Sequence, residues 1–224
     1  MEPLAKWCRA TYIEKKVKCV VGKQNKVCLE DGTSVKYDLL VVNVGSKTRG
    51  SHKVQGIWEH SLTTRPINYL LSKLEAKEKY LVENKIVPTV VVCGSGAAGT
   101  ELAFGYKKRW SKLFGQEIKV TIVGSTDTVL KGQTPAAIQE TNKMLNRHKI
   151  DVIHNENVAK IEADGVLCES GLKIPCTVAV WATGAEPQQV NLDSDLELIN
   201  GYISVNNFMQ STSHPNIFAG GDCC

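Results

Sequence analysis

The sequence predicts an α/β protein that contains a parallel β-sheet, and three observations carry this prediction. The apolar segment 90–92 runs into the glycine-rich turn 94–99, and the residues after the turn have the composition of a helix. Segment 119–124 then has the pattern of another strand, which completes a strand–turn–helix–strand unit. The continuous apolar run 39–42 is typical of a strand buried on both faces, as parallel-sheet strands are.

β-structure is also expected in front of this unit. Segments 16–22 and 26–46 alternate apolar and polar residues around the hairpin signal Asp31-Gly32. A loop is expected from Gly45 to Thr64, and Pro66 suits the first turn of the helix that follows it. The apolar stripe of this helix is expected to contain Ile67, Leu70, Leu71 and Leu74.

The second half of the chain predicts one more helix and a series of short strands. The helix is expected near 135–147 and is followed by an apolar segment that starts at Ile150. Glycine-containing turns at Asp164-Gly165 and Ser170-Gly171 separate the next segments, which predicts a β-meander appended to the parallel sheet. The expected short strands lie at 158–163, 165–170, 172–176 and 178–184, with two more within 201–224.

The composition excludes several classes of protein. The chain has 224 residues, 42% of them hydrophobic and 22% charged, with a net charge of +4, as in ordinary soluble globular proteins. No cluster of lysine and arginine is interleaved with aromatic residues, so no nucleic-acid partner is expected. The apolar runs are shorter than the ~20 residues that a transmembrane helix needs, and the first residues do not resemble a signal peptide.

The eight cysteines have two interpretations, a metal or redox site and buried reduced thiols. Metal sites and redox dithiols usually need closely spaced pairs, and no CxxC or CxxxxC spacing occurs here. Reduced thiols of an intracellular protein, cytoplasmic or mitochondrial, are therefore expected, with no metal. The cysteines are Cys8, Cys19, Cys28, Cys93, Cys168, Cys176, Cys223 and Cys224.

The glycine-rich turn predicts a site for the pyrophosphate of a dinucleotide. Gly94 allows the tight turn out of the strand, Gly96 lets the backbone approach a phosphate, and Gly99 lets the helix pack closely on the strand. The amino end of the helix adds a partial positive charge. The alternative is a merely structural turn. The remaining residues of the turn are Ser95, Ala97 and Ala98.

The strand after the helix departs from the usual pattern. In such units this strand commonly ends in an acidic residue that binds the ribose of NAD. Here it ends in Gly124-Ser125, which offers neither a carboxylate for the 2′-hydroxyl nor an arginine for a 2′-phosphate. We therefore expect weak discrimination between NADH and NADPH, with Gly124 among the binding residues.

Three further segments carry a resemblance to a known family. They are YDLLVVNVGS (37–46), VWATGAEP (180–187) and HPNIFAGGD (214–222). Together with the glycine-rich turn, they resemble the FAD-dependent pyridine nucleotide-disulphide oxidoreductase superfamily. The chain is most similar to the branch without a redox dithiol, which contains type II NADH dehydrogenases and apoptosis-inducing-factor-like proteins. The segment RPINYLL (65–71) resembles the NADH-dehydrogenase-like domain associated with selenophosphate synthetase.

The resemblance implies two interleaved Rossmann-like dinucleotide-binding domains. An incomplete FAD-binding domain would consist of residues 1–86 and 187–224. A complete NAD(P)H-binding domain with a β-meander would occupy residues 87–186. The turn 94–99 would then be the family's second glycine-rich turn, the one that holds NAD(P)H.

The resemblance also assigns residues to the chain crossings between the two domains. Val44 and Gly45 match the first crossing, where the backbone lies against a planar ring or a ribose. Ala182, Thr183 and Gly184 match the second crossing. Plain strand ends are the alternative for both segments.

Two acidic residues match positions of the family that lie near its cofactors. Gly221-Asp222 match the motif whose carboxylate accepts a hydrogen bond from the ribityl chain of the flavin. Glu101 matches an acid near the nicotinamide. A helix N-cap is the alternative for Asp222, and a solvated glutamate in the first helical turn is the alternative for Glu101.

The implied function is that of an FAD-dependent NAD(P)H oxidoreductase, which passes hydride from NAD(P)H to flavin and then to a quinone or similar acceptor. The cofactors carry this chemistry, so no side chain is expected to be catalytic. The family's first glycine-rich turn is missing, so a fragment of a flavoenzyme is expected, with exposed apolar surface around 39–42. Any peripheral membrane contact is expected outside this chain. The alternative is a non-catalytic NAD(P)H-binding module that has lost its flavin site.

Overall fold

The computed structural model describes residues 2–65 and 67–224, which fold into two compact units. Unit 1 comprises residues 1–47 and 186–224, and unit 2 comprises residues 48–185. The chain passes between the units at β5 (Lys47–Thr48) and β14 (Ala185–Glu186). Unit 2 is therefore inserted into unit 1, as the interleaved arrangement predicts. No helix in the described ranges is long and apolar enough to cross a bilayer.

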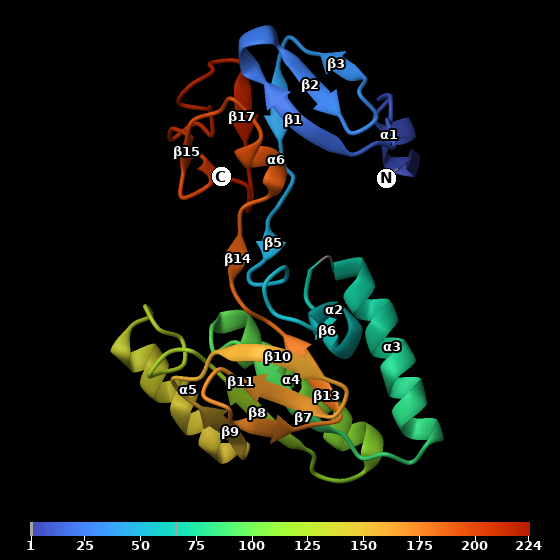
Figure 1. The fold of residues 1–224 in the computed structure, drawn as a ribbon, viewed down its shortest axis with the longest axis vertical. Helices are drawn as coiled ribbons and strands as arrows, with labels where there is room; N and C mark the ends of the chain where they lie inside the picture. The colour runs from blue at the N-terminus through green and yellow to red at the C-terminus, as the bar shows by residue number, and fades with distance from the viewer. Residues whose placement is uncertain (1, 66) are drawn as a thin grey trace. The chain divides into compact units, whose positions relative to one another are not determined.

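Unit 2 is built on a parallel sheet with the order β6-β13-β7-β8-β9 (Figure 1). Neighbouring strands are in register, with Val91 of β7 opposite Thr121 of β8 and Ala179 of β13. The predicted strand–turn–helix–strand unit is confirmed, because α4 connects β7 to the parallel strand β8. The strands are β6 (Ser61–Thr63), β7 (Thr89–Cys93), β8 (Lys119–Val123), β9 (Ile150–Ile153) and β13 (Val178–Trp181).

The strands of this sheet are apolar throughout because both faces are covered. In β7, Val90 and Val92 point to one face while Val91 and Cys93 point to the other, and all four are at most 2% exposed. Val90 and Val92 belong to a core with helices α3, α4 and α5. Val91 and Cys93 belong to a second core with α2 and the meander. The helices are α2 (Ile57–His60), α3 (Ile67–Glu83), α4 (Ala97–Phe114) and α5 (Pro135–Arg147).

The predicted β-meander is confirmed as a separate three-stranded antiparallel sheet. The last of the four short strands is an exception, because β13 joins the parallel sheet between β6 and β7. Its residues are all buried, which explains a pattern without alternation. The strands of the meander are β10 (Val158–Glu162), β11 (Gly165–Cys168) and β12 (Lys173–Pro175).

Three expectations for the segment in front of the glycine-rich turn are wrong. Residues 45–64 are not all loop, because β6 forms the edge of the parallel sheet. The first division of the chain therefore lies after Lys47 rather than after residue 86. The stripe of α3 is narrower than predicted: Leu70 is buried, but Ile67 is 64% exposed and Leu71 is 58% exposed, because only one side of α3 faces the sheet. The predicted start at Pro66 lies outside the described residues.

Unit 1 contains the predicted hairpin and a smaller core. Strands β1, β2 and β3 form an antiparallel sheet, with the Asp31-Gly32 turn between β2 and β3. Strand β1 is tied to a distant segment, because the amide of Val20 donates to Ser194 Oγ at 2.8 Å. The elements of unit 1 are α1 (Glu2–Trp7), β1 (Val17–Val21), β2 (Lys26–Leu29), β3 (Ser34–Lys36), β4 (Leu40–Val42), α6 (Gln189–Leu192), β15 (Leu198–Ile199), β16 (Tyr202–Ile203) and β17 (Ile217–Ala219), with a 3₁₀ turn at Gly22–Gln24.

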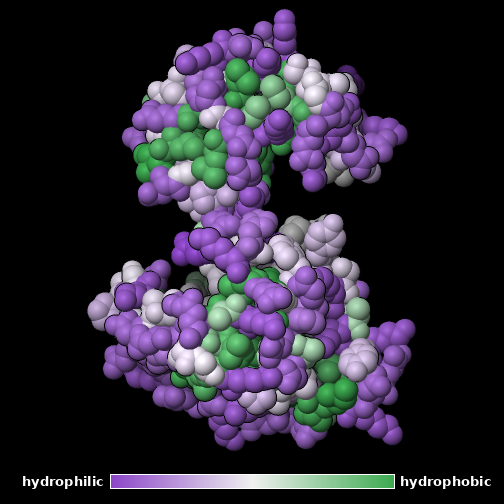
Figure 2. Space-filling model, viewed as in Figure 1, coloured by the Kyte–Doolittle hydropathy of each residue, from purple (hydrophilic) through white to green (hydrophobic). Residues whose placement is uncertain are grey.

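The apolar run 39–42 forms a parallel strand, as predicted, but it is buried on one face only. β4 pairs with β17, with Val42 opposite Ala219. Val42 is 6% exposed, whereas Leu39 is 60% and Val41 is 66% exposed, because nothing in the described chain covers the second face. The expected exposure of apolar surface around this run is thus confirmed. Figure 2 shows that the surface of unit 1 carries hydrophobic areas among its hydrophilic ones.

Candidate dinucleotide site

The three glycine positions of the turn 94–99 differ in what a side chain would contact there. Gly94 has a φ of 126°, and a Cβ there would meet the carbonyl oxygen of Ala182. A Cβ on Gly99 would meet the carbonyl oxygen of Gly94. Gly96 has an ordinary φ of −76°, and a Cβ there would meet nothing within 4 Å. The protein itself requires the first and last glycines, whereas Gly96 keeps open the space in front of the backbone.

That space belongs to a cavity of about 400 Å³ at the carboxyl ends of β7, β8 and β13. A cavity of this size is within the range of small-molecule sites, and this edge of the sheet is where ligands of open α/β folds bind. Nine of the predicted residues line it. They are Gly94, Ser95, Gly96, Ala97, Ala98, Gly124, Ala182, Thr183 and Gly184.

The electrostatics of the cavity favour an anion. Its charged lining consists of Arg49, Arg65 and Lys131 against the carboxylate of Glu156, and Lys131 is also paired with Asp127 outside the lining. Gly96 is the N-cap of α4, and no side chain caps the first turn. Ala97 and Ala98 are exposed there. The first-turn N–H groups of an α-helix have no partner within the helix, so they are suited to phosphate oxygens.

Arg49 holds the segment after β13 in place. Its carbonyl oxygen accepts hydrogen bonds from Thr183 Oγ1 at 2.6 Å and Trp181 Nε1 at 3.0 Å. Its amide donates to the carbonyl of Gly184 at 2.8 Å, and its guanidinium donates to the carbonyl of Ala185 at 3.2 Å. The predicted residues Thr183 and Gly184 are therefore held at the rim of the cavity by the backbone of Arg49, a residue that the sequence did not identify.

No sequence pattern identified the cationic residues of the cavity as part of a site. Arg49 lies within the segment 45–64, which the sequence predicts to be a loop, and Arg65 directly follows it. Their places at the cavity depend on the insertion of β6 into the sheet. Lys131 comes from the connection between β8 and α5, where its Nζ lies 3.2 Å from Asp127 Oδ1. This contact lowers the pKa of Asp127. A basic residue near a turn is common on any surface, so only the fold selects these three.

The end of β8 is more restricted than its sequence indicates. Gly124 is buried, and a Cβ there would collide with the side chain of Ser95. Ser95 Oγ lies 3.2 Å from Thr126 Oγ1, so two hydroxyl groups fill the place next to the glycine. Ser125 is exposed and also lines the cavity. Ser125, rather than Gly124, is therefore the position at which a longer side chain can extend into the cavity.

Gly99 and Glu101 do not line this cavity. Gly99 is buried against the strand, which fits its expected role in packing the helix. Glu101 instead lines a mainly apolar groove between α3 and α4, together with Leu70 and Leu102. The expected contact of Glu101 with a nicotinamide stays a prediction.

The four predicted residues of unit 1 lie close together. Because β4 and β17 are parallel neighbours, Val44-Gly45 and Gly221-Asp222 both follow the carboxyl end of a strand. Asp222 Oδ2 accepts a hydrogen bond from Ser46 Oγ at 3.1 Å. Gly45 and Gly221 have φ angles of 68° and 75°, which favour glycine. A Cβ on Gly45 would meet nothing within 4 Å.

The cysteines are free thiols, and half of them are buried. Burial raises the pKa of Cys168 and Cys176 to about 11, and it raises the pKa of Cys93 as well. The expectation that all eight are buried is wrong, because Cys8 is exposed and Cys19, Cys28 and Cys224 are half-buried. The described residues contain no group of histidine, cysteine and acidic side chains that could hold a metal.

Comparison with known proteins decides the family. A sequence profile described as pyridine nucleotide-disulphide oxidoreductase matches residues 5–224. The chain belongs to this family. It is 25% identical to the ferredoxin–NAD(+) reductase component of a 3-phenylpropionate/cinnamic acid dioxygenase from Photorhabdus laumondii, over 95% of this chain and 54% of that protein. It is 24% identical to the mitochondrial external NADH-ubiquinone oxidoreductase 2 of Saccharomyces cerevisiae, over 97% of this chain and 49% of that protein.

The fold agrees with this family. The structure of NDH2 from Plasmodium falciparum in complex with NADH superimposes with a TM-score of 0.75 at 18% identity. The match covers 96% of this chain and 50% of that one. The chain thus spans about half the length of the relatives it matches.

Proposed function

We propose that the cavity of unit 2 binds NAD(P)H and that the chain acts in an FAD-dependent NAD(P)H oxidoreductase. The open space in front of Gly96 is the observation that carries the proposal. The fold requires glycine at 94 and 99 but not at 96, where the missing side chain leaves room for a ligand beside the first turn of α4. A pyrophosphate fits this place because it needs N–H donors, cationic neighbours and close backbone approach.

FAD would be held in part by the cluster at the ends of β4 and β17 in unit 1. Asp222 offers a carboxylate to a hydroxyl group, and Gly45 leaves open space beside the backbone. This arrangement fits a ribityl chain lying across the two strand ends. When bound, the nicotinamide supplies a hydride and the flavin accepts it. The residues of the chain bind and orient the two cofactors.

The electron acceptor we propose is a quinone or a ferredoxin-type protein. Ubiquinone and ferredoxin are the acceptors or partners in the names of the two relatives described above. The acceptor is the part of the proposal that the family leaves open, because these two relatives are matched about equally well.

Two titrations test the proposal on the 224-residue chain. FAD fluorescence should be quenched on binding, and anaerobic NADH or NADPH should then bleach the visible absorption of the bound flavin. Asp222→Ala should weaken FAD binding at least tenfold. Asp38→Ala is the matched control, because Asp38 is an exposed carboxylate at the other end of β4. If calorimetric titration shows that NAD(P)H binds while FAD does not, the nicotinamide site is supported, and the part of the FAD domain present in this chain does not hold flavin by itself. If neither binds, the proposal is wrong.

A further inference from the structure

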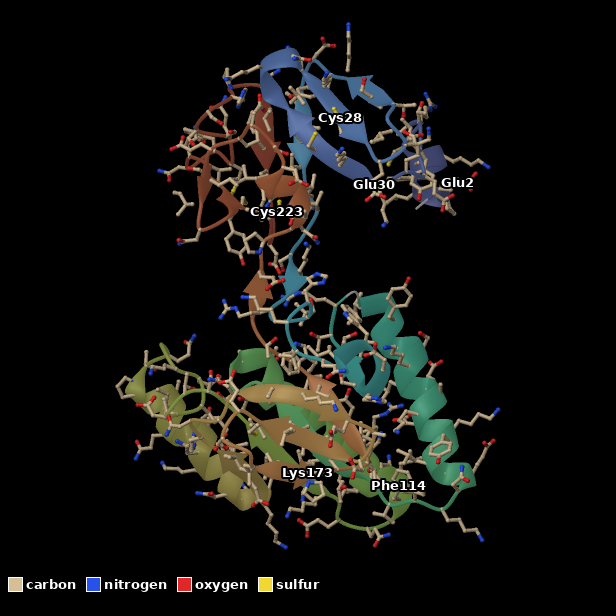
Figure 3. The ribbon with its side chains drawn as sticks, viewed as in Figure 1. Glu2, Cys28, Glu30, Phe114, Lys173 and Cys223 are labelled. Carbon is tan, nitrogen blue, oxygen red and sulfur yellow. The ribbon has the colours of Figure 1, made fainter. Side chains whose placement is uncertain are left out.

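Cys19 and Cys28 lie directly opposite each other on two antiparallel strands of unit 1. Cys19 is on β1 and Cys28 on β2, and the register pairs them with each other, next to the pair Val20 and Val27. Figure 3 labels Cys28 on this hairpin and draws its sulfur in yellow. Residues that face each other across an antiparallel ladder project to the same side of the sheet. Both thiols therefore leave the sheet on one side, as neighbours.

The backbone spacing of such a pair suits a disulfide. Opposite residues of antiparallel strands have Cα atoms ~4.5 Å or ~5.5 Å apart, depending on their hydrogen-bonding position. A disulfide needs a Cα separation of about 4.4–6.8 Å. Val20 turns its amide to Ser194 and its carbonyl to Asp195, away from β2, so the adjacent Cys19 and Cys28 form a hydrogen-bonded pair with the wider Cα spacing. That spacing is within the disulfide range, but the two Cβ atoms must approach each other for the S–S bond to form. The register shifts between Val17 and Cys19, which adds a local irregularity next to the pair.

The two thiols already interact in the reduced protein. Burial raises the pKa of Cys19, and a hydrogen bond with the Cys28 thiol raises it further. Both residues are half-buried, so a small oxidant can reach them. Cys93 and Cys223, by contrast, are at most 1% exposed. The pair belongs to unit 1, and neither residue lines the cavity at the glycine-rich turn.

We propose that Cys19 and Cys28 are an oxidation-sensitive pair that closes to a cross-strand disulfide, with a peroxide or a low-molecular-weight disulfide as oxidant. With a disulfide oxidant, the two protein thiols lose two electrons and two protons as their S–S bond forms, and the oxidant leaves as two thiols. With hydrogen peroxide, one thiol is first oxidised to a sulfenic acid and releases one water. The second thiol then displaces a second water as the S–S bond forms.

The cross-link would fasten the amino-terminal hairpin of unit 1. Strand β1 is held at Val20, whose amide donates to Ser194 Oγ, and the turn directly after it is held at Gly22, whose amide donates to Asp195 Oδ1. A bond between β1 and β2 would extend this attachment to the second strand. It would also restrict the unfolded chain, so the oxidised protein should unfold at a higher temperature than the reduced protein. This proposal is independent of NAD(P)H binding in unit 2.

The test treats the folded 224-residue chain with oxidised glutathione, alkylates the remaining thiols and digests the protein with trypsin. Lys23 and Lys26 separate the two cysteines, so a disulfide joins two different tryptic peptides. We expect this linked pair as the main oxidised product, with Cys93 and Cys223 alkylated only after denaturation. Dithiothreitol should remove the link.

Two variants serve as controls. Cys19→Ser should abolish the linked peptides and leave Cys28 with a bound glutathione. Cys8→Ser removes the exposed cysteine near α1 and should leave the link unchanged. The proposal is overturned if oxidation stops at separate glutathione adducts on Cys19 and Cys28. It is equally overturned if the link forms only in denaturant, because the folded hairpin would then not bring the thiols together.

Discussion

Arg109 and Glu78 join α4 to α3 through two parallel hydrogen bonds. Arg109 Nε donates to Oε1 at 2.6 Å and Nη2 donates to Oε2 at 2.8 Å. Oε1 of the same carboxylate also accepts from Nε1 of Trp110, whose side chain is fully buried. Trp110 is the largest fully buried side chain of the core beneath these helices. Glu78 therefore satisfies the one polar atom of that side chain.

Removing Glu78 should destabilise unit 2 more than removing Arg109. In Glu78→Ala the indole N–H loses its acceptor inside the protein, which costs about 2 kcal/mol. Arg109→Ala should cost about 1 kcal/mol, because its side chain is 58% exposed and Trp110 keeps its partner. Glu75→Ala, an exposed glutamate of the same helix, is the matched control. Urea unfolding measures all three, and equal losses for Glu75 and Glu78 would contradict this reading.

The same contact predicts a pH dependence. The hydrogen bonds from Arg109 lower the pKa of Glu78 below its usual value of 4.5. Below that value the unfolded chain binds a proton that the folded chain does not, so stability falls as the pH drops through the folded pKa. The difference in unfolding free energy between the wild type and Glu78→Ala should therefore be largest near neutral pH and shrink below pH 4.5. A constant difference would exclude a charged Glu78 as the stabilising form.

Gly96→Val should separate folding from ligand binding. The added side chain enters open space at an ordinary φ, so the free protein should keep its unfolding temperature. The same side chain stands where we place the pyrophosphate, so NADH affinity should fall at least tenfold, or ~1.4 kcal/mol. Calorimetric titration of the wild type and the variant measures this loss.

Gly99→Ala provides the opposite case. Its methyl group would meet the carbonyl oxygen of Gly94, so it should destabilise the free protein by about 1–3 kcal/mol. Gly105→Ala, on the exposed side of α4, should lower neither the NADH affinity nor the stability of the protein, because a Cβ there has space. Unchanged NADH affinity in Gly96→Val would show that the ligand does not occupy the turn.

The sequence predicted those parts of the fold that depend on local patterns. The β7–α4–β8 unit, the helix at 135–147 and the Asp31-Gly32 hairpin follow from periodicity and turn chemistry. Strand β6 was missed because Ser61–Thr63 is short and polar in sequence, and only its place at the edge of the sheet makes it a strand. The burial of β4 was misjudged because an apolar run does not tell how many of its faces are covered.

The sequence predicted the backbone segments of the candidate site but not its cationic side chains. Nine of the predicted residues line the cavity because a glycine-rich turn and strand ends have fixed places in a parallel sheet. Arg49, Arg65 and Lys131 come from connections, whose course is set by tertiary packing. The pairing of Cys19 with Cys28 was hidden for a similar reason, since it arises from the register of a hairpin rather than from spacing along the chain.

Position 125 should control the choice between NADH and NADPH. The exposed Ser125 follows the buried Gly124 at the end of β8, at the place where dinucleotide folds select the ribose. Serine carries no charge, and the nearby Lys131 is already engaged with Asp127. The wild type should therefore prefer neither cofactor by more than about a hundredfold, or ~2.7 kcal/mol.

Opposite charges at this one position should move the preference in opposite directions. Ser125→Glu adds a carboxylate that can accept from the 2′-hydroxyl of NADH and repels the 2′-phosphate of NADPH, so the ratio of affinities should shift at least tenfold toward NADH. Ser125→Arg should shift it toward NADPH through pairing with the phosphate. Because the residue is exposed, both variants should keep the unfolding temperature of the wild type. Calorimetric titration of each variant with both cofactors gives the ratios. Shifts in the same direction for Glu and Arg would place the ribose elsewhere.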